Sequence, residues 1–213
     1  MDVLANMVAL LNAPAFLIWG ATVSWAEVLG DVSGALCVWL VTRQHVLNWP
    51  IGLLNNVFWA LLFWRAMLYA DAALQGVFFG LGAYGWWNWV RGGTNPSAAL
   101  PVRRSRRAEW LAIGGLTVPL TAALAWLLAR HTHSPAPFWD ASVLTLSIAA
   151  TYGQTQKLVE SWWLWILVDV ISVPLYVSRA LYPTALLYVV FGCLCVKGLL
   201  SWRRDLRLGE VLA

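Results

Sequence analysis

The sequence predicts an all-α polytopic membrane protein with seven transmembrane helices. Of its 213 residues, 61% are hydrophobic and only 11% are charged, whereas a soluble domain is about half apolar and a quarter charged. The apolar residues gather in seven long segments with short joints between them, and part of the sequence is repeated. This composition argues against a free-standing cytosolic enzyme and against a disordered chain, because so much apolar surface must be buried.

The seven apolar segments are the predicted spans. Each approaches the roughly 20 residues that a helix needs to cross a bilayer, and helices are required because the hydrocarbon core offers no water to backbone groups. The sequence lacks the alternating strands of about ten residues that form a membrane β-barrel. The segments cover residues 24–42, 50–69, 71–90, 110–129, 138–156, 162–178 and 183–201.

Residues 1–23 form a separate N-terminal segment. No basic region precedes the apolar stretch 3–19, so a cleavable signal peptide is not indicated. Asn12 and Pro14 interrupt this short stretch. We therefore expect an interfacial or re-entrant segment rather than a full span.

The basic residues predict how the chain lies in the membrane. Eleven of the 14 Lys and Arg residues fall on one side of the predicted spans, and positive residues concentrate in cytoplasmic loops. We expect this side, with the linker 91–109 and the tail 203–213, to be cytoplasmic in a bacterial inner membrane. The arginine run of the linker is explained by this topology signal, with anionic-lipid contact as a minor role. The positive residues do not form one basic face, so no nucleic-acid partner is expected.

An internal repeat divides the chain. Shifting the sequence by 113 positions superposes residues 49–89 on residues 162–202 without a gap. The period contains four predicted crossings, so the two copies have the same orientation in the membrane. Two tryptophan pairs and one glycine pair match at this offset: Trp49 with Trp162, Trp89 with Trp202, and Gly85 with Gly198.

The repeat predicts a 3+1+3 arrangement of helices. A first three-helix bundle covers residues 24–90, a linker helix covers 110–129, and a second three-helix bundle covers 138–202. Parallel repeats related by an axis along the membrane normal are a common plan of transporters, which hold their substrate near the midplane between the repeats. We therefore expect a transporter.

One stripe of aromatic and polar side chains is the main candidate binding site. Trp162, Trp165 and Asp169 are spaced i, i+3 and i+7, which places them on one face of a helix. Indole rings stack on a flat ligand, and a carboxylate accepts hydrogen bonds from polar groups at the edge of that ligand. The stripe therefore suits a polar, ring-containing molecule.

The first repeat offers further candidates. Trp49 and Asn56 occupy the positions equivalent to the start and end of this stripe, and Asn55 and Gln75 also lie deep in apolar segments. Polar residues within the membrane are costly and are often functional. Two other interpretations stay open: tryptophans near helix ends mark the membrane interface, and Asn or Gln can join helices by hydrogen bonds. For Asp31, the flanking glycines also indicate close helix packing.

Signals for catalysis and metal binding are weak. His131 and His133 have no third ligand beside them, and the sequence contains no nucleophile elbow, zinc-protease motif or Walker loop. Cys37, Cys193 and Cys195 lie inside apolar segments and are expected to be core residues. We expect no enzyme, cofactor or metal site. A membrane-embedded enzyme acting on a lipid and a purely structural helical scaffold are the alternatives from other classes.

Two stretches resemble the PnuC family of vitamin transporters, NWPIGLLNNVFWALLFWRAMLYADAALQ and PFWDASVLTLSIAATYGQTQKLVESWWLWILVD. The likeness covers about residues 24–202, and the motif Trp-x-x-Trp-x-x-x-Asn/Asp is its most specific part. The resemblance implies a full-length SWEET-like fold and a homotrimer in the lipid bilayer.

The resemblance also implies a substrate and a site. Family members carry nicotinamide riboside by facilitated diffusion, and a cytoplasmic vitamin kinase makes uptake one-way; related subgroups carry thiamine or riboflavin, which are the alternative substrates here. The implied site consists of Trp162, Trp165 and Asp169 with Asn55 and Gln75. Asn56 and Trp49 are kept as candidates because the internal repeat singles them out.

Overall fold

The computed structural model describes residues 10–11, 13–18, 21–65, 67, 69–92, 100–132 and 134–212. Expectations for residues 1–9, for Asn12, for residues 93–99 of the linker and for His133 therefore lie outside the described residues. The described part forms seven long helices and one small sheet. In chain order these are β1 (Pro14–Ile18), β2 (Ala21–Ser24), α2 (Trp25–Thr42), α3 (Asn48–Arg65), α4 (Tyr69–Arg91), α5 (Arg107–His131), α6 (Pro137–Thr155), α7 (Ser161–Ser178) and α8 (Tyr182–Leu212).

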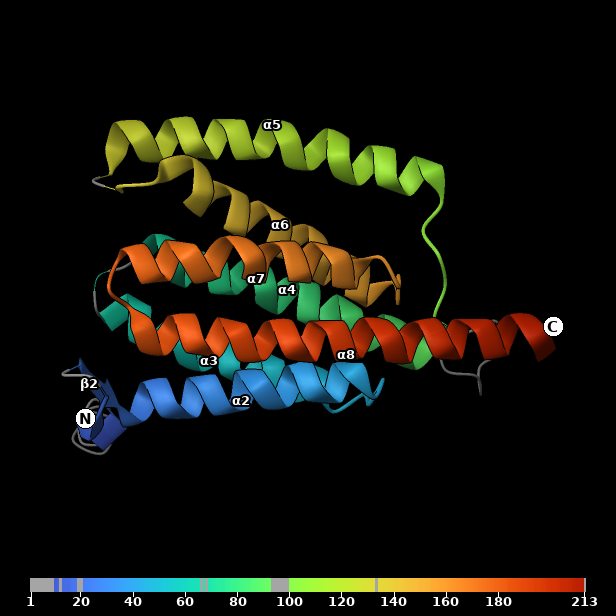
Figure 1. The fold of residues 1–213 in the computed structure, drawn as a ribbon, viewed down its shortest axis with the longest axis horizontal. Coiled ribbons are helices and arrows are strands. Elements are labelled where there is room, and N and C mark those ends of the chain that lie inside the picture. Colours follow the sequence, from blue (N-terminus) through green and yellow to red (C-terminus); the bar gives the residue numbers. More distant parts are fainter. Residues whose placement is uncertain are drawn as a thin grey trace.

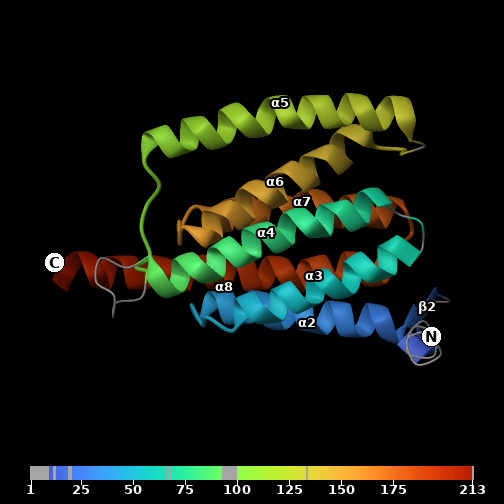
Figure 2. The same ribbon diagram turned by 180° about the vertical axis from the view of Figure 1, so that it is seen from behind.

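The helices run roughly side by side along the length of the molecule (Figures 1 and 2). The joints after α2, α4 and α6 lie at the same end as the C terminus of α8, and we call this the basic end because most Lys and Arg residues belong to it. The small sheet lies at the opposite end. Each predicted span coincides with one helix, with shifts of a few residues at most ends.

Four of the described helices are long and apolar enough to cross a membrane, namely α2, α5, α7 and α8. The other three have similar lengths but are less apolar. Helix α6 illustrates the reason, because its buried side chains include Ser142, Thr145, Ser147 and Gln154. Small polar residues of this kind let membrane helices pack closely. The helices together make a multi-pass membrane protein.

Six helices form a closed ring, and α5 lies outside it. In the ring α2 packs on α3, α3 on α4, α4 on α6, α6 on α7, α7 on α8, and α8 returns to α2. Helix α5 packs on α6 and lies at the edge of the molecule (Figure 1). These contacts are symmetric. If α2, α3 and α4 exchange places with α6, α7 and α8, respectively, the same six helix pairs are in contact.

Equivalent turns close the helix pairs of the two copies. Gln44 and Lys157 have positive φ angles of 54° and 49°, and their N–H groups donate to the carbonyl three residues earlier at 2.9 and 3.1 Å. Met67 and Ala180, also one period apart, both have φ of 58°. Residues other than glycine seldom adopt this conformation, so its recurrence shows that the two copies follow the same backbone path through these turns.

Four buried tryptophans join the two copies inside the ring. Trp49 meets Trp89 edge to face, with ring centroids 5.3 Å apart and planes at 88°. The equivalent pair, Trp162 and Trp202, has a centroid distance of 5.4 Å and the same angle. Trp89 and Trp202 lie 6.1 Å apart and connect the pairs. This cluster, which we call the tryptophan cluster, has the geometry that aromatic rings prefer.

Glycine makes room for the outer ring of each pair. A Cβ atom at Gly85 would overlap the Trp49 ring, and a Cβ atom at Gly198 would overlap the Trp162 ring. The inner rings are fixed by hydrogen bonds to the other copy: Trp89 Nε1 donates to the carbonyl of Gln154 at 2.9 Å, and Trp202 Nε1 donates to the carbonyl of Val41 at 3.0 Å. The matching glycines of the sequence are thus required by packing.

The observed boundaries correct two sequence predictions. Helix α3 ends at Arg65, because the backbone turns at Met67, so the predicted span 50–69 is too long. Helix α8 does not end at residue 201, where the last span is predicted to end, but continues to Leu212 through most of the predicted tail. No proline interrupts this segment, and Leu206 packs against the buried apolar core that includes the four tryptophans.

Within residues 14–24 the structure contains a small sheet that the predicted all-α fold does not include. This stretch forms an antiparallel pair, β1 with β2, in which Phe16 faces Val23 and Leu17 faces Thr22. Pro14 lacks the N–H group that a helix interior needs, and β-branched Thr22 and Val23 favour extended backbone. The sequence analysis predicted no strand here.

We predict that Gly198→Ala lowers the thermal unfolding temperature of the detergent-purified protein. The added methyl group overlaps the Trp162 ring, and overpacking of this kind costs about 1–3 kcal/mol. Gly114→Ala on α5 is the matched control, because no side chain lies near a Cβ atom there. An equal change in both variants would contradict the packing role of Gly198.

Candidate binding site

One face of α7 carries four buried polar atoms that have no hydrogen-bond partner among the described residues. They are Trp162 Nε1, Trp165 Nε1, Asp169 Oδ2 and Ser172 Oγ. Their spacing continues the stripe that the sequence predicts by one further turn. Buried polar atoms are nearly always paired in folded proteins, and an unpaired one costs about 1–3 kcal/mol. The α7 stripe, as we call these four residues, is therefore the strongest candidate for a ligand site within the described chain.

Helix α8 supplies the wall opposite Asp169. A Cβ atom at Gly192 would lie 3.6 Å from Asp169 Cβ and 3.8 Å from its Oδ2, so the glycine leaves open the space beside the carboxyl group. The buried thiol of Cys195 also lies next to this carboxyl group. The ring of Tyr188 packs on Tyr176, with centroids 5.1 Å apart. The thiol of Cys195 and the ring of Tyr188 therefore provide polar and aromatic groups on the α8 side of the stripe.

The first repeat contributes a less polar counterpart. Trp49 is buried, and its Nε1 also lacks a partner among the described residues. Asn56 and Gln75 are half-buried on α3 and α4, and neither side chain forms a hydrogen bond with another described residue.

Asn55 forms hydrogen bonds within the first repeat through its side-chain amide N–H group. Its Nδ2 donates to the carbonyl of Gly30 at 3.2 Å and to Ser33 Oγ at 2.5 Å, which connects α3 to α2. For this residue the structure shows the interhelical hydrogen bond that the sequence left as an alternative.

Gly30 and Gly34, which flank Asp31, face other helices. A Cβ atom at Gly30 would overlap the Trp59 ring of α3. A Cβ atom at Gly34 would lie 3.6 Å from the Phe191 ring of α8. The close packing that the sequence indicates around Asp31 is therefore present, and Asp31 itself lies within electrostatic reach of Tyr188.

Sequence reasoning missed two residues of this region. Ser172 is fully buried, and extending the spacing i, i+3, i+7 to i+10 would have found it. Tyr188 stands one period after Gln75, so the internal repeat marked its position. Neither residue type attracts attention in isolation, because Ser and Tyr are common in membrane helices.

The basic end of the ring is closed by hydrogen bonds that cross between the two copies. Lys157 is only 3% exposed, and its Nζ donates to Gln44 Oε1 at 3.1 Å and lies 4.5 Å from the centroid of the Trp89 ring. Gln44 Nε2 donates in turn to Asp205 Oδ2 at 2.7 Å. Burial lowers the pKa of Lys157 from its usual 10.5 to about 8.

Four other hydrogen bonds cross at the same end. The cross-bond set comprises Lys157–Gln44, Gln44–Asp205, Asn88–Thr155, Trp89–Gln154, Gln156–Tyr84 and Trp202–Val41. Among the described residues, these six are the side-chain hydrogen bonds that join the first copy, residues 25–91, to the second copy, residues 137–212. Within the described part of the chain, the side-chain hydrogen bonds between the two copies thus lie at the basic end.

A multi-pass helical bundle with a buried polar site between its helices has the architecture of a membrane transporter. The chain belongs to the nicotinamide mononucleotide transporter family, whose model matches residues 24–204. This result confirms the resemblance to the PnuC vitamin transporters and shows that the chain is a transporter rather than an enzyme. The match begins where the first helix bundle is predicted to begin.

Individual relatives agree with this assignment. The chain is 31% identical over 212 residues to the nicotinamide riboside transporter PnuC of Escherichia coli K12, which covers 88% of this chain and 89% of the relative. It is 30% identical over 204 residues to the riboflavin/roseoflavin transporter RibM of Streptomyces davaonensis, with coverages of 92% and 95%. A crystal structure of the vitamin B3 transporter PnuC has the same fold, with a TM-score of 0.68, 24% identity, and coverage of 86% of this chain and 82% of that one.

We predict that the unfolding temperature rises between pH 8 and pH 10, relative to a Lys157→Met variant. In this window folded Lys157 has released a proton that the unfolded chain still binds, so the free energy of unfolding rises by about 2–3 kcal/mol. Lys197→Met removes an exposed lysine and should keep the rise. Identical pH profiles for the wild type and Lys157→Met would contradict the burial of this amine.

Proposed function

We propose that this chain carries nicotinamide riboside across the bacterial inner membrane by facilitated diffusion, and that the α7 stripe binds the vitamin. The observation that carries the proposal is the row of four buried, unpaired polar atoms on one helix face. Two indole rings suit the flat, positively charged pyridinium, and the Asp169 carboxyl group matches its charge. The Ser172 hydroxyl and the amides of Asn56 and Gln75 can bind ribose hydroxyls and the carboxamide. The name of the Escherichia coli relative supports this substrate.

The helix arrangement that we propose is 3+1+3, with two parallel three-helix units and α5 as the linker helix between them. The symmetric contacts of the ring, the equivalent turns and the matching tryptophan pairs support it. The units are residues 24–90 and 138–202, and the remaining divisions are the N-terminal segment 1–23, the linker 91–109, the linker helix 110–129 and the tail 203–213. In this arrangement the α7 stripe faces α8 inside the second unit.

The basic end, including the C terminus, is cytoplasmic in this proposal, since positive residues are retained on that side. The cross-bond set then holds the cytoplasmic side shut. Rocking of one unit against the other would break these hydrogen bonds and the Trp89–Trp202 contact, and would open the site toward the cytoplasm. We further propose that the protein is a homotrimer, and that a cytoplasmic vitamin kinase phosphorylates the incoming vitamin and so prevents its return.

Riboflavin is the second candidate substrate, because the similarity to RibM is nearly as high as that to the Escherichia coli transporter. Riboflavin is neutral, whereas nicotinamide riboside and thiamine are cations. The carboxyl group of Asp169 therefore favours the two cations, and competition among the three vitamins separates these possibilities.

We predict that vesicles containing the purified protein show saturable uptake of labelled nicotinamide riboside. Trp165→Ala and Asp169→Asn should each weaken apparent affinity about tenfold, because a desolvated cation–π contact or charge partner contributes about 1–2 kcal/mol. Trp110→Ala on α5 removes a tryptophan outside the ring and should leave uptake unchanged.

Two results would contradict the proposed function. One is the absence of saturable flux in vesicles that contain folded protein. The other is uptake by Trp165→Ala and Asp169→Asn that equals uptake by the wild type, which would place the substrate elsewhere in the ring.

A further inference from the structure

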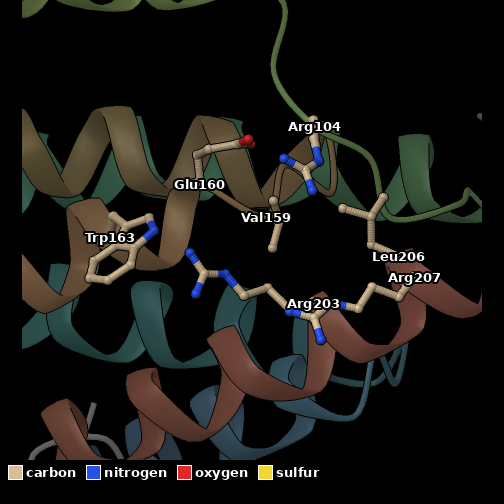
Figure 3. A pocket seen from close by; sticks show the side chains of 7 residues that line it. All are labelled: Arg104, Val159, Glu160, Trp163, Arg203, Leu206 and Arg207. Atoms are coloured by element: carbon tan, nitrogen blue, oxygen red, sulfur yellow. The ribbon is translucent and has the colours of Figure 1, made fainter.

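A pocket lies at the basic end, and none of the four residues of the α7 stripe lines it (Figure 3). Its volume is about 330 Å³. It is bounded by the linker on one side and by the start of α7 and the end of α8 on the other. The lining residues are Arg104, Val159, Glu160, Trp163, Arg203, Leu206 and Arg207.

The backbone holds the linker beside this pocket. The N–H group of Arg103 donates to the carbonyl of Lys157 at 3.1 Å, and the N–H group of Val159 donates to the carbonyl of Arg103 at 3.0 Å. These two hydrogen bonds pair the linker with the joint between α6 and α7. The backbone of the linker is therefore held at the pocket, and Arg104, the next residue, lines it.

The pocket carries an excess of positive charge. Three arginines line it, and Glu160 is the one acidic residue among the lining side chains. Glu160 Oε2 accepts the backbone N–H of Ser105 at 2.9 Å. The guanidinium of Arg203 lies 5.2 Å from the centroid of the Trp163 ring, which leaves its N–H groups free to turn toward an anion. Guanidinium groups bind phosphate oxygens with matched geometry.

Apolar strips lead from the pocket along the outside of the ring. On α7, Trp163, Leu167 and Val170 lie on one face and are 47%, 45% and 63% exposed. On α8, Val196 and Leu200 lie on the face that ends at the pocket arginines and are 46% and 61% exposed. The Trp163–Arg203 contact places the two strips side by side. A cationic pocket continuous with apolar strips fits an amphipathic anion rather than a soluble one.

We propose that this pocket binds the phosphate headgroup of an anionic phospholipid, whose acyl chain lies along the exposed strips of α7 and α8. Headgroup phosphates occur at the level where spanning helices leave the bilayer, and Trp163 is a residue type that favours this level. A free phosphate shares the headgroup chemistry but has nothing to place on the apolar strips. The proposal does not depend on which vitamin the α7 stripe binds.

The test measures binding of phosphatidylglycerol, phosphatidylcholine and inorganic phosphate to the full chain in detergent micelles. We expect phosphatidylglycerol to bind more tightly than phosphatidylcholine, and inorganic phosphate not to displace it at equal concentration. Each interfacial arginine contributes about fivefold to binding of an anionic lipid, so the double variant Arg203→Gln/Arg207→Gln should bind phosphatidylglycerol about 25-fold more weakly. Arg204→Gln, at an exposed neighbouring position outside the pocket, should change binding less than about twofold.

Three outcomes would overturn the proposal. Equal binding of the two lipids would remove the role of lipid charge, and displacement by inorganic phosphate would make the pocket a site for soluble anions. An effect of Arg204→Gln equal to that of the double variant would indicate diffuse surface attraction. Gel filtration and unfolding temperature establish whether each variant is folded. If the double variant does not fold, the comparison of the three probes on the wild-type protein tests the proposal.

Discussion

Polar groups inside a membrane protein need partners within the protein, because lipid offers none. The helices here satisfy most of them internally, and the cross-bond set satisfies others by tying the two copies together at the basic end. The α7 stripe leaves this constraint unmet at four polar atoms of one helix face, the largest such group on a single helix among the described residues. A molecule that brings its own donors and acceptors gains free energy by entering the ring there, which is why the proposed site and the closed basic end belong to one account.

The two copies share the residues that build the ring and differ in the residues proposed to bind. The tryptophan and glycine pairs match across the period, and so do the turns with positive φ. Among the residues of the site, Asn56 of the first copy is equivalent in the repeat to Asp169 of the second, and Gln75 is equivalent to Tyr188. An asymmetric ligand such as a nucleoside requires different groups on its two sides. Repetition therefore supplies a stable frame, and divergence between the copies supplies the chemistry.

The helices and the α7 stripe were predictable because both depend on spacing along one chain. Segment length fixes the spans, and the period of the helix places Trp162, Trp165 and Asp169 on one face. The interhelical bond of Asn55 and the burial of Lys157 were not predictable, because each arises only where separate helices meet. In the sequence Lys157 is a lysine in a short polar joint, and it becomes buried when the second copy closes against Gln44 and Trp89. The small sheet was missed because a short apolar stretch does not distinguish strand from helix.

The most direct test of the central claim is a structure of the protein with nicotinamide riboside bound. The account predicts that the vitamin lies against α7, with its ring beside Trp165 and with hydrogen bonds to Asp169 Oδ2 and Ser172 Oγ. Pairing of these atoms with the vitamin would explain why the chain leaves them without internal partners. A vitamin bound elsewhere, with the four atoms of the α7 stripe still unpaired, would contradict the account.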